Sequence, residues 1–368
     1  MSLLFSNRGL IRTIVEEEKI LITMTPTAGF TVGFNLTFTG SIDIDFKDGG
    51  GKEALTSGIE KTHLYASAGT YIAEITGDFT NITKFIADNN RITFISGLKT
   101  GLLTDFRINN NLYVGALDMS NAPTSGLFWV DNNSGMTSIM HSSTGNAIIT
   151  NYQYDGNDIT GVLDLSNQPI GGVFYGYNNS NNTGITFASS GNSIVTGFRL
   201  YNNNLTALDL SNVPTGTLFY VYGNNNLITI THASSGNSVI NDYRVQNTGL
   251  NSTLTLTNQP IGNIFWVHDT SALLNILFSS TGNSALVSCY CDDNLLQNID
   301  FSNFPTSTPI IRLTGNSLTA TEHDNQLINL DNQGWINGTL SITTGNTART
   351  SASDTAYNNL IANGWTII

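Results

Sequence analysis

The chain has 368 residues, a formal net charge of −13 and a charged fraction of 11%. A negative balance of this size argues against a phosphate-backbone ligand, so we expect no nucleic-acid partner. No apolar run approaches the roughly 18 residues that a membrane-spanning helix needs, and residues 1–8 are too polar for a secretion signal. We therefore expect no membrane-spanning segment and no export by the usual route.

Residues 1–80 lack the repeat found later and are expected to form an N-terminal arm followed by a small β-sandwich. Apolar residues alternate along 30–38 and 42–46, which predicts two strands, and the glycine-rich stretch 47–51 predicts a turn. Residues 63–75 follow the spacing H-x-Y-x-x-x-G-x-Y-x-x-x-I. This spacing resembles an element of PKD-like sandwich modules, which implies an immunoglobulin-like sandwich here.

Three aspartates, Asp43, Asp45 and Asp48, lie just before the glycines of this turn. The resemblance to PKD-like modules implies that they are structural and set the turn. A calcium ion is the alternative, because calcium prefers oxygen ligands such as carboxylates. Acidic turn residues more often accept hydrogen bonds from backbone amides, so we predict no metal and no other cofactor.

A repeat of about 45 residues organises residues 81–318. Five versions of a Leu-Asp-Leu-Ser-Asn-x-x-Pro-like segment recur, and their prolines are spaced by 46, 45, 46 and 45 residues. Each unit divides into two turns, and segments such as 198–208 fit the leucine-rich pattern L-x-L-x-x-N-x-L-x-x-L. This predicts a leucine-rich-repeat-like β-solenoid of about eleven turns between Phe85 and Leu318, with connections that are extended or short 3₁₀ segments.

Side chains alternate between the two faces of a strand, so the pattern also predicts which positions are buried. Cys289 and Cys291 lie two apart on one predicted strand and point the same way, which makes a disulfide between them geometrically poor. The expected core positions are Phe128, Val130, Phe174, Phe198, Leu200, Phe219, Val221, Phe265, Val267, Cys289, Cys291, Ile311 and Leu313.

Residues 319–368 break the period and are expected to form a small α/β module that caps the last turn. Segment 321–331 predicts a helix and 338–342 predicts a strand. Ser353 is placed to cap a second helix, which the Asn-Gly pair at 363–364 ends. The predicted fold class is therefore mainly β: a sandwich, a solenoid and an α/β cap.

The combination of a PKD-like opening, Asn-rich turns and this terminal module resembles structural and surface proteins of bacteriophages that infect Bacteroidetes-type bacteria. It is also similar to the surface repeat proteins of those hosts. The resemblance implies a spike, fibre or tail-tip protein that is a homo-oligomer and attaches to other virion proteins through its N-terminal region. Because no export signal is recognised, the virion surface is favoured over the bacterial cell surface.

Aromatic side chains follow the buried phenylalanines in equivalent turns and are expected on the outer strand face as an aromatic ladder. Arginines are expected on the same face from the intervening turns. Rings two turns apart would lie roughly 9 to 10 Å from one another, a spacing that suits sugars stacking on successive rings. The candidate ligand-binding residues are Trp129, Tyr175, Tyr177, Tyr220, Tyr222, Trp266, His268, Arg199 and Arg244.

Three uses of this ladder stay open: contact with a host surface glycan or receptor, burial in a subunit interface, and stacking within the chain. The first predicts a non-enzymatic attachment protein, and the second a purely structural decoration or connector protein. A polysaccharide-cleaving depolymerase is the third hypothesis, with Asp131 and Asp155 as outward acids. We predict no catalytic residues, since His141 and His232 occupy equivalent, structural positions in two repeats.

Overall fold

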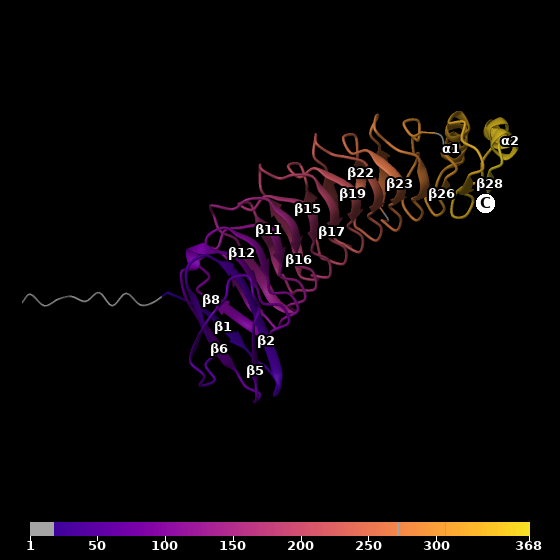
Figure 1. The fold of residues 1–368 in the computed structure, drawn as a ribbon. Helices are drawn as coiled ribbons and strands as arrows, with labels where there is room; N and C mark the ends of the chain where they lie inside the picture. Colours follow the sequence, from indigo (N-terminus) through magenta and orange to yellow (C-terminus); the bar gives the residue numbers. More distant parts are fainter. Residues whose placement is uncertain (1–17, 271, 306) are drawn as a thin grey trace, which may run out of the picture.

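The computed structural model describes residues 18–270, 272–305 and 307–368. The expected N-terminal arm lies almost entirely in residues 1–17, outside the described residues. The fold is mainly β and contains a long β-solenoid of about ten turns with few helices. Figure 1 shows the N-terminal strands at one end of an elongated molecule and both α-helices at the other.

The N-terminal strands form antiparallel sheets. One sheet has the order β4-β3-β6-β1-β8, and β2 pairs with β5 on one side and β7 on the other. These elements are β1 (Lys19–Met24), β2 (Phe30–Phe38), β3 (Ile42–Asp45), β4 (Lys52–Ala54), β5 (Lys61–Tyr65), β6 (Tyr71–Gly77), η1 (Phe79–Asn81), β7 (Ile82–Ile86) and β8 (Ile92–Ser96). β7 pairs with β9 of the solenoid, whereas β8, which follows β7 in the chain, pairs with β1 of the N-terminal sheet. Hydrogen-bonded strands therefore connect the two sides of the expected boundary at residue 80.

Two of the three aspartates near the glycine-rich turn at residues 47–51 accept hydrogen bonds from backbone amides of that turn. The Asp45 carboxylate accepts from the Lys47 amide at 2.9 Å, and Asp48 accepts from the Gly50 amide at 3.1 Å. Within the described ranges, no group of three or more His, Cys, Asp or Glu side chains is placed to hold a metal ion. These contacts are those of turn-setting residues.

The front of the solenoid is a parallel sheet with one strand per turn. β7 precedes these strands in the sheet. After it come β9 (Leu103–Arg107), β11 (Thr124–Trp129), β13 (Ile149–Gln153), β15 (Ile170–Tyr175), β17 (Val195–Arg199), β19 (Thr215–Tyr220), β21 (Ile240–Arg244), β23 (Ile261–Trp266), β25 (Leu286–Tyr290) and β26 (Ile310–Arg312). Each strand pairs with the next in register, so residues at equivalent positions form rows along the molecule. The ten turns are close to the eleven expected.

The second face of the solenoid is built from four two-stranded parallel sheets. They pair β10 (Val114–Asp118) with β12 (Gly135–Met140), β14 (Gly161–Leu165) with β16 (Asn182–Phe187), β18 (Ala207–Asp209) with β20 (Thr229–Thr231), and β22 (Asn251–Thr255) with β24 (Ala272–Leu277). The expectation of extended connections is confirmed.

The core lies between these two faces. All thirteen predicted core positions are buried, with at most 2% of any residue exposed. Equivalent rings stack from turn to turn, as in Phe85, Phe106 and Phe128, whose centroids are 5.6 and 5.4 Å apart. Cys289 and Cys291 are free thiols with their sulfurs 3.7 Å apart, as predicted.

A ladder of buried asparagines joins the turns. The amide of Asn203 donates to the Leu200 carbonyl in its own turn and to the Gly176 carbonyl in the preceding turn, both at 2.9 Å. Its oxygen accepts from the Asn179 amide at 2.7 Å. The same pattern of two donated bonds recurs at Asn111, Asn133, Asn157, Asn179, Asn224, Asn294 and Asn316.

Threonines replace asparagine in two consecutive turns of this ladder. The Thr248 hydroxyl donates to the Val245 carbonyl of its own turn at 3.0 Å. The Thr270 hydroxyl donates to the side-chain oxygen of Asn294 in the following turn. A hydroxyl has one hydrogen to donate whereas an amide has two. Neither threonine can therefore bond to a carbonyl of its own turn and to a carbonyl of the preceding turn at once, as the asparagines do.

The C-terminal segment adds two α-helices, one short 3₁₀ helix and two short strands. These are α1 (Ala320–Asn332), β27 (Thr339–Ser341), η2 (Ser351–Ser353), α2 (Asp354–Ala362) and β28 (Thr366–Ile367). Thr319 and Glu322 form a capping box at the start of α1. From α1, Gln326 accepts from the Ile299 amide at 3.0 Å, and Leu327 and Leu330 are fully buried.

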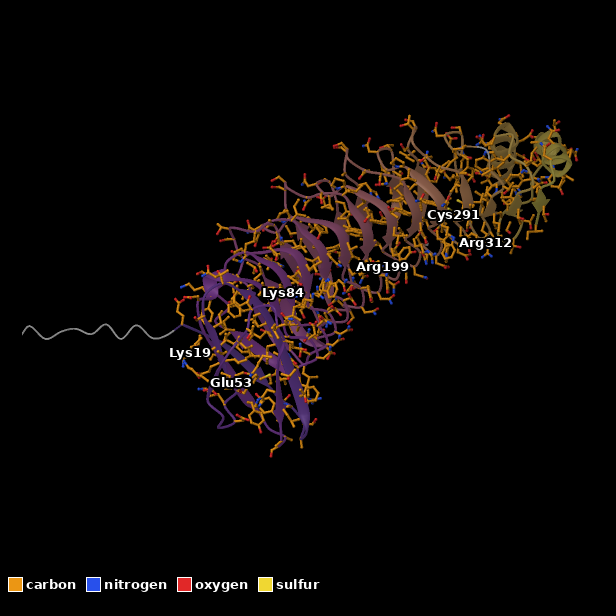
Figure 2. The ribbon with its side chains drawn as sticks, viewed as in Figure 1. Lys19, Glu53, Lys84, Arg199, Cys291 and Arg312 are labelled. Atoms are coloured by element: carbon orange, nitrogen blue, oxygen red, sulfur yellow. The ribbon has the colours of Figure 1, made fainter. Side chains whose placement is uncertain are left out.

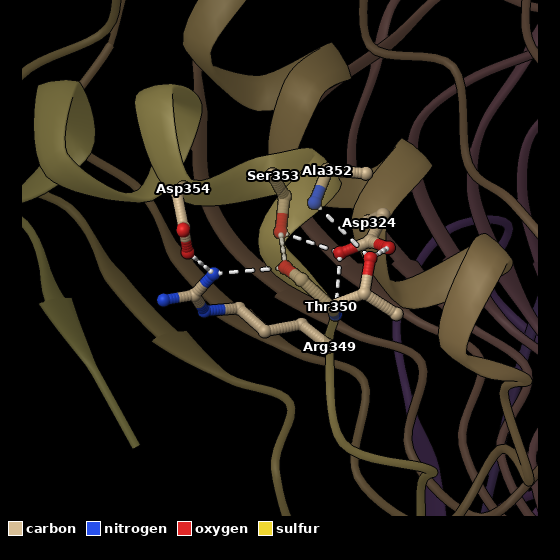
Figure 3. Close-up of polar contacts among 6 residues, drawn as sticks. All are labelled: Asp324, Arg349, Thr350, Ala352, Ser353 and Asp354. Atoms are coloured by element: carbon tan, nitrogen blue, oxygen red, sulfur yellow. Dashed lines mark hydrogen bonds and ion pairs between the residues drawn. The ribbon is translucent and has the colours of Figure 1, made fainter.

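Ser353 lies at the N-cap position of α2, where the sequence predicts a cap, but its side chain makes no capping bond. The Ser353 hydroxyl instead donates to Asp324 of α1 at 2.5 Å. Figure 3 shows Asp324 also accepting from the amide and hydroxyl of Thr350. The Ser353 hydroxyl therefore bonds to a buried carboxylate of another helix instead of capping its own helix. The Asp324 carboxylate accepts three hydrogen bonds from Thr350 and Ser353.

We predict that Asn203→Asp strongly destabilises the solenoid. Aspartate keeps the acceptor but loses both N–H donors, so the Leu200 and Gly176 carbonyls each lose one of their two asparagine donors and face a buried negative charge. The expected loss is about 3 kcal/mol, seen as a lower urea midpoint and melting temperature. The exposed Asn225→Asp is the matched control and should change stability little; equal effects of the two substitutions would contradict the structural role of the ladder.

Candidate ligand-binding surface

The outer face of the parallel sheet carries three rows of side chains. The central row follows the buried core residue of each strand, a ring in most turns, by one residue: Arg107, Trp129, Gln153, Tyr175, Arg199, Tyr220, Arg244, Trp266, Tyr290 and Arg312. The carboxyl-end row lies two residues further along, and the amino-end row lies two residues before the central one. Figure 2 labels Arg199 and Arg312 along the same side of the solenoid.

In the central row, arginines lie between aromatic rings. The Arg199 guanidinium is 4.6 Å from the Tyr175 ring centroid and 5.7 Å from that of Tyr220. Arg244 lies 5.0 Å from Tyr220 and 4.2 Å from Trp266. Further along, the Trp266 and Tyr290 rings are parallel at 5.1 Å. Cation–π contacts and ring stacking therefore fix this row from turn to turn.

This packing changes which chemical groups of the surface a sugar could contact. The sequence predicts open ring faces about two turns apart, but arginines from the intervening turns cover these faces. Tyr220 is covered on both sides by Arg199 and Arg244, and Trp266 by Arg244 and Tyr290. A ligand would meet ring edges, hydroxyls and guanidinium N–H groups rather than stack on ring faces.

The carboxyl-end row joins a stretch of acids to a stack of tyrosines. Tyr177, Tyr201 and Tyr222 are nearly parallel, with centroids 4.5 and 4.7 Å apart. Asp155 precedes them in this row and is hydrogen-bonded to the Tyr177 side chain. His268 lies further along and bonds to Asp269 through Nδ1 at 2.7 Å. Tyr177, Tyr222 and His268 thus lie where the sequence places them, on the outer face.

The acids of this row are partly desolvated. The pKa of Asp155 is raised to about 6, chiefly by burial and in part by the nearby charge of Asp131. Burial also raises the pKa of Asp131 and Asp292, and it raises the pKa of Asp88 to about 6. At neutral pH these carboxylates are charged at a cost in free energy, which favours contact with a hydrogen-bond donor.

The amino-end row supplies partners to the central row. Asp105 binds Arg107 through two bonds of 2.7 and 3.0 Å, and Asp242 binds Arg244 through bonds of 2.7 and 2.9 Å. Asp242 also accepts from the Tyr220 hydroxyl at 2.6 Å. These paired charges orient the guanidinium groups within the row.

All nine predicted site residues lie on this one face, eight of them in consecutive turns from β15 to β23. The sequence analysis did not select Tyr201, Asp105 or Asp242. Tyr201 follows Phe198 by three residues, the same offset as Tyr177 from Phe174, so the register already contained this signal. The aspartates lie two residues before an arginine on the same strand, and that spacing is the signal for an ion pair.

His141 and His232 lie away from this face, in equivalent turns. The Nε2 atom of His141 is 2.8 Å from the Tyr152 hydroxyl, and that of His232 is 3.3 Å from the Tyr243 hydroxyl. Their rings also pack against Phe128 and Phe219. Burial lowers the pKa of His141 to about 4 and that of His232 to about 3.

The fold and the surface together define a mainly β solenoid with an in-register polar and aromatic strand face. No family model, curated protein or solved structure matches the chain. Across the residues that the structure describes, no helix is both long and apolar enough to cross a membrane.

His141, which is half-buried, and His232, which is buried, predict an acid-dependent loss of stability. Their pKa values are lower in the folded chain than the value of about 6.5 expected when unfolded, so the unfolded chain takes up protons first as the pH falls. Between pH 7.5 and 5 this costs roughly 2 kcal/mol per histidine. Asp88 and Asp155, whose pKa values are raised on folding, act in the opposite direction.

The measurement compares melting temperature against pH for the wild type and a His141→Gln, His232→Gln double variant. Both proteins contain the same aspartates, so the aspartate contribution cancels in the difference. The wild-type curve should fall more steeply below pH 6.5 than that of the variant. Parallel curves would show that folding does not lower the pKa values of these histidines.

Proposed function

We propose that this chain is a non-enzymatic surface protein of a bacteriophage particle that binds a host surface glycan or receptor. The binding surface is the outer strand face of the solenoid. The observation that carries the proposal is the set of three in-register rows, which places guanidinium, hydroxyl, carboxylate and imidazole groups along one face. Repeated groups at a fixed spacing suit a repeating ligand such as a polysaccharide.

Unpaired polar atoms on the same face support a ligand or partner there. Trp129 Nε1, Arg199 Nε, Gln246 Oε1 and Asp292 Oδ1 are buried atoms without a hydrogen-bond partner among the described residues. All four belong to the central and carboxyl-end rows. Leaving such groups unpaired costs free energy, and a bound polar ligand would relieve that cost after small side-chain shifts.

The remaining parts of the proposal rest on the sequence resemblance. The N-terminal strands would form a PKD-like sandwich that attaches the chain to other virion proteins, and residues 319–368 would cap the solenoid. The protein would form a homo-oligomer at the virion surface as a spike, fibre or tail-tip component. Many copies acting together would convert weak single contacts into strong attachment. A bacterial cell surface is the alternative location.

A purely structural decoration or connector role is the second candidate. The observation that favours it is the covering of the Tyr220 and Trp266 ring faces by neighbouring side chains, because rings that stack within the chain contribute to stability without a ligand. In that case the outer face would be buried between subunits. Light scattering of the purified protein and cross-linking within the particle would distinguish the two roles.

We expect the purified protein, displayed in many copies on beads, to bind whole host-type cells and selected members of a bacterial polysaccharide array. A Tyr177→Ala, Tyr201→Ala, Tyr222→Ala variant should bind at least about tenfold less, because it loses three hydroxyls and the ring edges of the carboxyl-end row. The matched control is Val114→Ser, Val162→Ser, Ile228→Ser, which changes exposed residues on the second face.

Retained binding by the tyrosine variant would show that the outer strand face is not the binding surface. Absence of wild-type binding to every cell and polysaccharide under multivalent display would overturn the attachment function and leave the structural role. Loss of polysaccharide viscosity on incubation would instead indicate a depolymerase. Melting temperatures of all variants verify that they are folded.

A further inference from the structure

Arg199 differs from the two ion-paired arginines of the central row. Arg107 and Arg244 each bind an aspartate two residues earlier on the same strand. At the corresponding place before Arg199 the chain has Gly197, which is in register with Asp242 through Leu218. Arg199 therefore lacks the internal carboxylate that the equivalent arginines have.

The Arg199 guanidinium is nonetheless held in place. It lies between the Tyr175 and Tyr220 rings, and its Nε atom is buried with no acceptor among the described residues. The neighbouring carboxylates are engaged elsewhere, since Asp155 bonds to Tyr177 and Asp242 bonds to Arg244 and Tyr220. A guanidinium has five N–H donors in a planar fork, so an oriented group with unpaired donors is available here.

Arg312 shows why the position of Arg199 is distinctive. It also lacks an aspartate two residues earlier, where the chain has Ile310. However, Arg312 is exposed to solvent, which can satisfy its donors, and it lies over a single ring, that of Tyr290, at 4.0 Å. Arg199 is half-buried between two rings.

The backbone does not require glycine at position 197. Its φ angle lies outside the left-handed region, and an added Cβ would make ordinary contacts of 3.5 Å with Tyr175 and Val173. A side chain therefore fits at this position. The chain thus has no side chain at the position where Asp105 and Asp242 lie in the equivalent strands, and the Tyr175 ring borders that position.

We propose that Arg199 and the space beside Gly197 form a binding site for the carboxylate of an acidic sugar. The guanidinium fork would bind the two carboxylate oxygens in the way that Arg107 binds Asp105. The Tyr175 hydroxyl is within 3.5 Å of the position that a Cβ would take at Gly197, so it borders the same space. This inference rests on the proposed glycan-binding function and specifies the class of glycan.

The test replaces the missing internal partner. In Gly197→Asp the new carboxylate should bind Arg199, as Asp105 binds Arg107, and so block the site while keeping the fold. The variant Gly197→Ala adds the Cβ without the charge and is the matched control. Arg199→Gln removes the guanidinium, and Asp105→Gly frees Arg107 and should create a second, weaker site.

The probe is a uronic-acid polysaccharide, compared with the same polymer after its carboxyl groups are reduced to alcohols. Binding is measured by biolayer interferometry at about 150 mM salt, which screens the long-range repulsion from the net negative chain. The wild type and Gly197→Ala should prefer the unreduced polymer by about tenfold or more, because a charge-assisted fork is lost on reduction. Gly197→Asp and Arg199→Gln should lose this preference.

Equal binding of the two polymers by the wild type would overturn the carboxylate assignment while leaving the glycan-binding function intact. A preference for a sulfated polymer over the uronic-acid polymer would overturn it as well. Binding to no polysaccharide would contradict the proposed function itself. A preference that persists in folded Gly197→Asp would place the carboxylate site elsewhere on the chain.

Discussion

The buried asparagine ladder is the interaction on which the rest of this structure depends. A parallel turn leaves carbonyl groups facing the interior at its corner, and each must find a donor. An asparagine amide offers two N–H groups and one oxygen, which is the set needed to bond to a carbonyl of its own turn and to a carbonyl and an N–H group of the turn before. Leucine would remove all three bonds, and aspartate would place a negative charge next to the carbonyls.

This constraint also produces the outer surface. Since the ladder fixes one residue of each turn against the next, every other position in the turn is brought into register with its equivalents. Side chains of the same offset then form rows, and arginines settle between aromatic rings without much further loss of side-chain freedom. The rows are thus stiff before any ligand arrives, which lowers the entropic cost of binding.

The repeat made the architecture predictable, but not the side-chain contacts between neighbouring turns. Period and alternation were sufficient to place Phe128, Val267 and Cys289 in the core and Trp129 on the outer face. They did not show that Arg244 covers Trp266, because that depends on side-chain direction between turns rather than on spacing within one turn. The exchange of Ser353 from a cap to a partner of Asp324 was equally invisible, since it joins residues 29 positions apart.

The two threonine turns give the array an uneven strength along its length. Thr248 and Thr270 make no side-chain bond to a carbonyl of the preceding turn, so backbone bonds and core packing alone join those turns to the ones before them. A pull along the solenoid axis loads all junctions in series, and the one with the fewest bonds yields first. If the molecule tethers two bodies, extension would begin near β21 and β23 while the turns around Arg199 and the N-terminal strands stay intact.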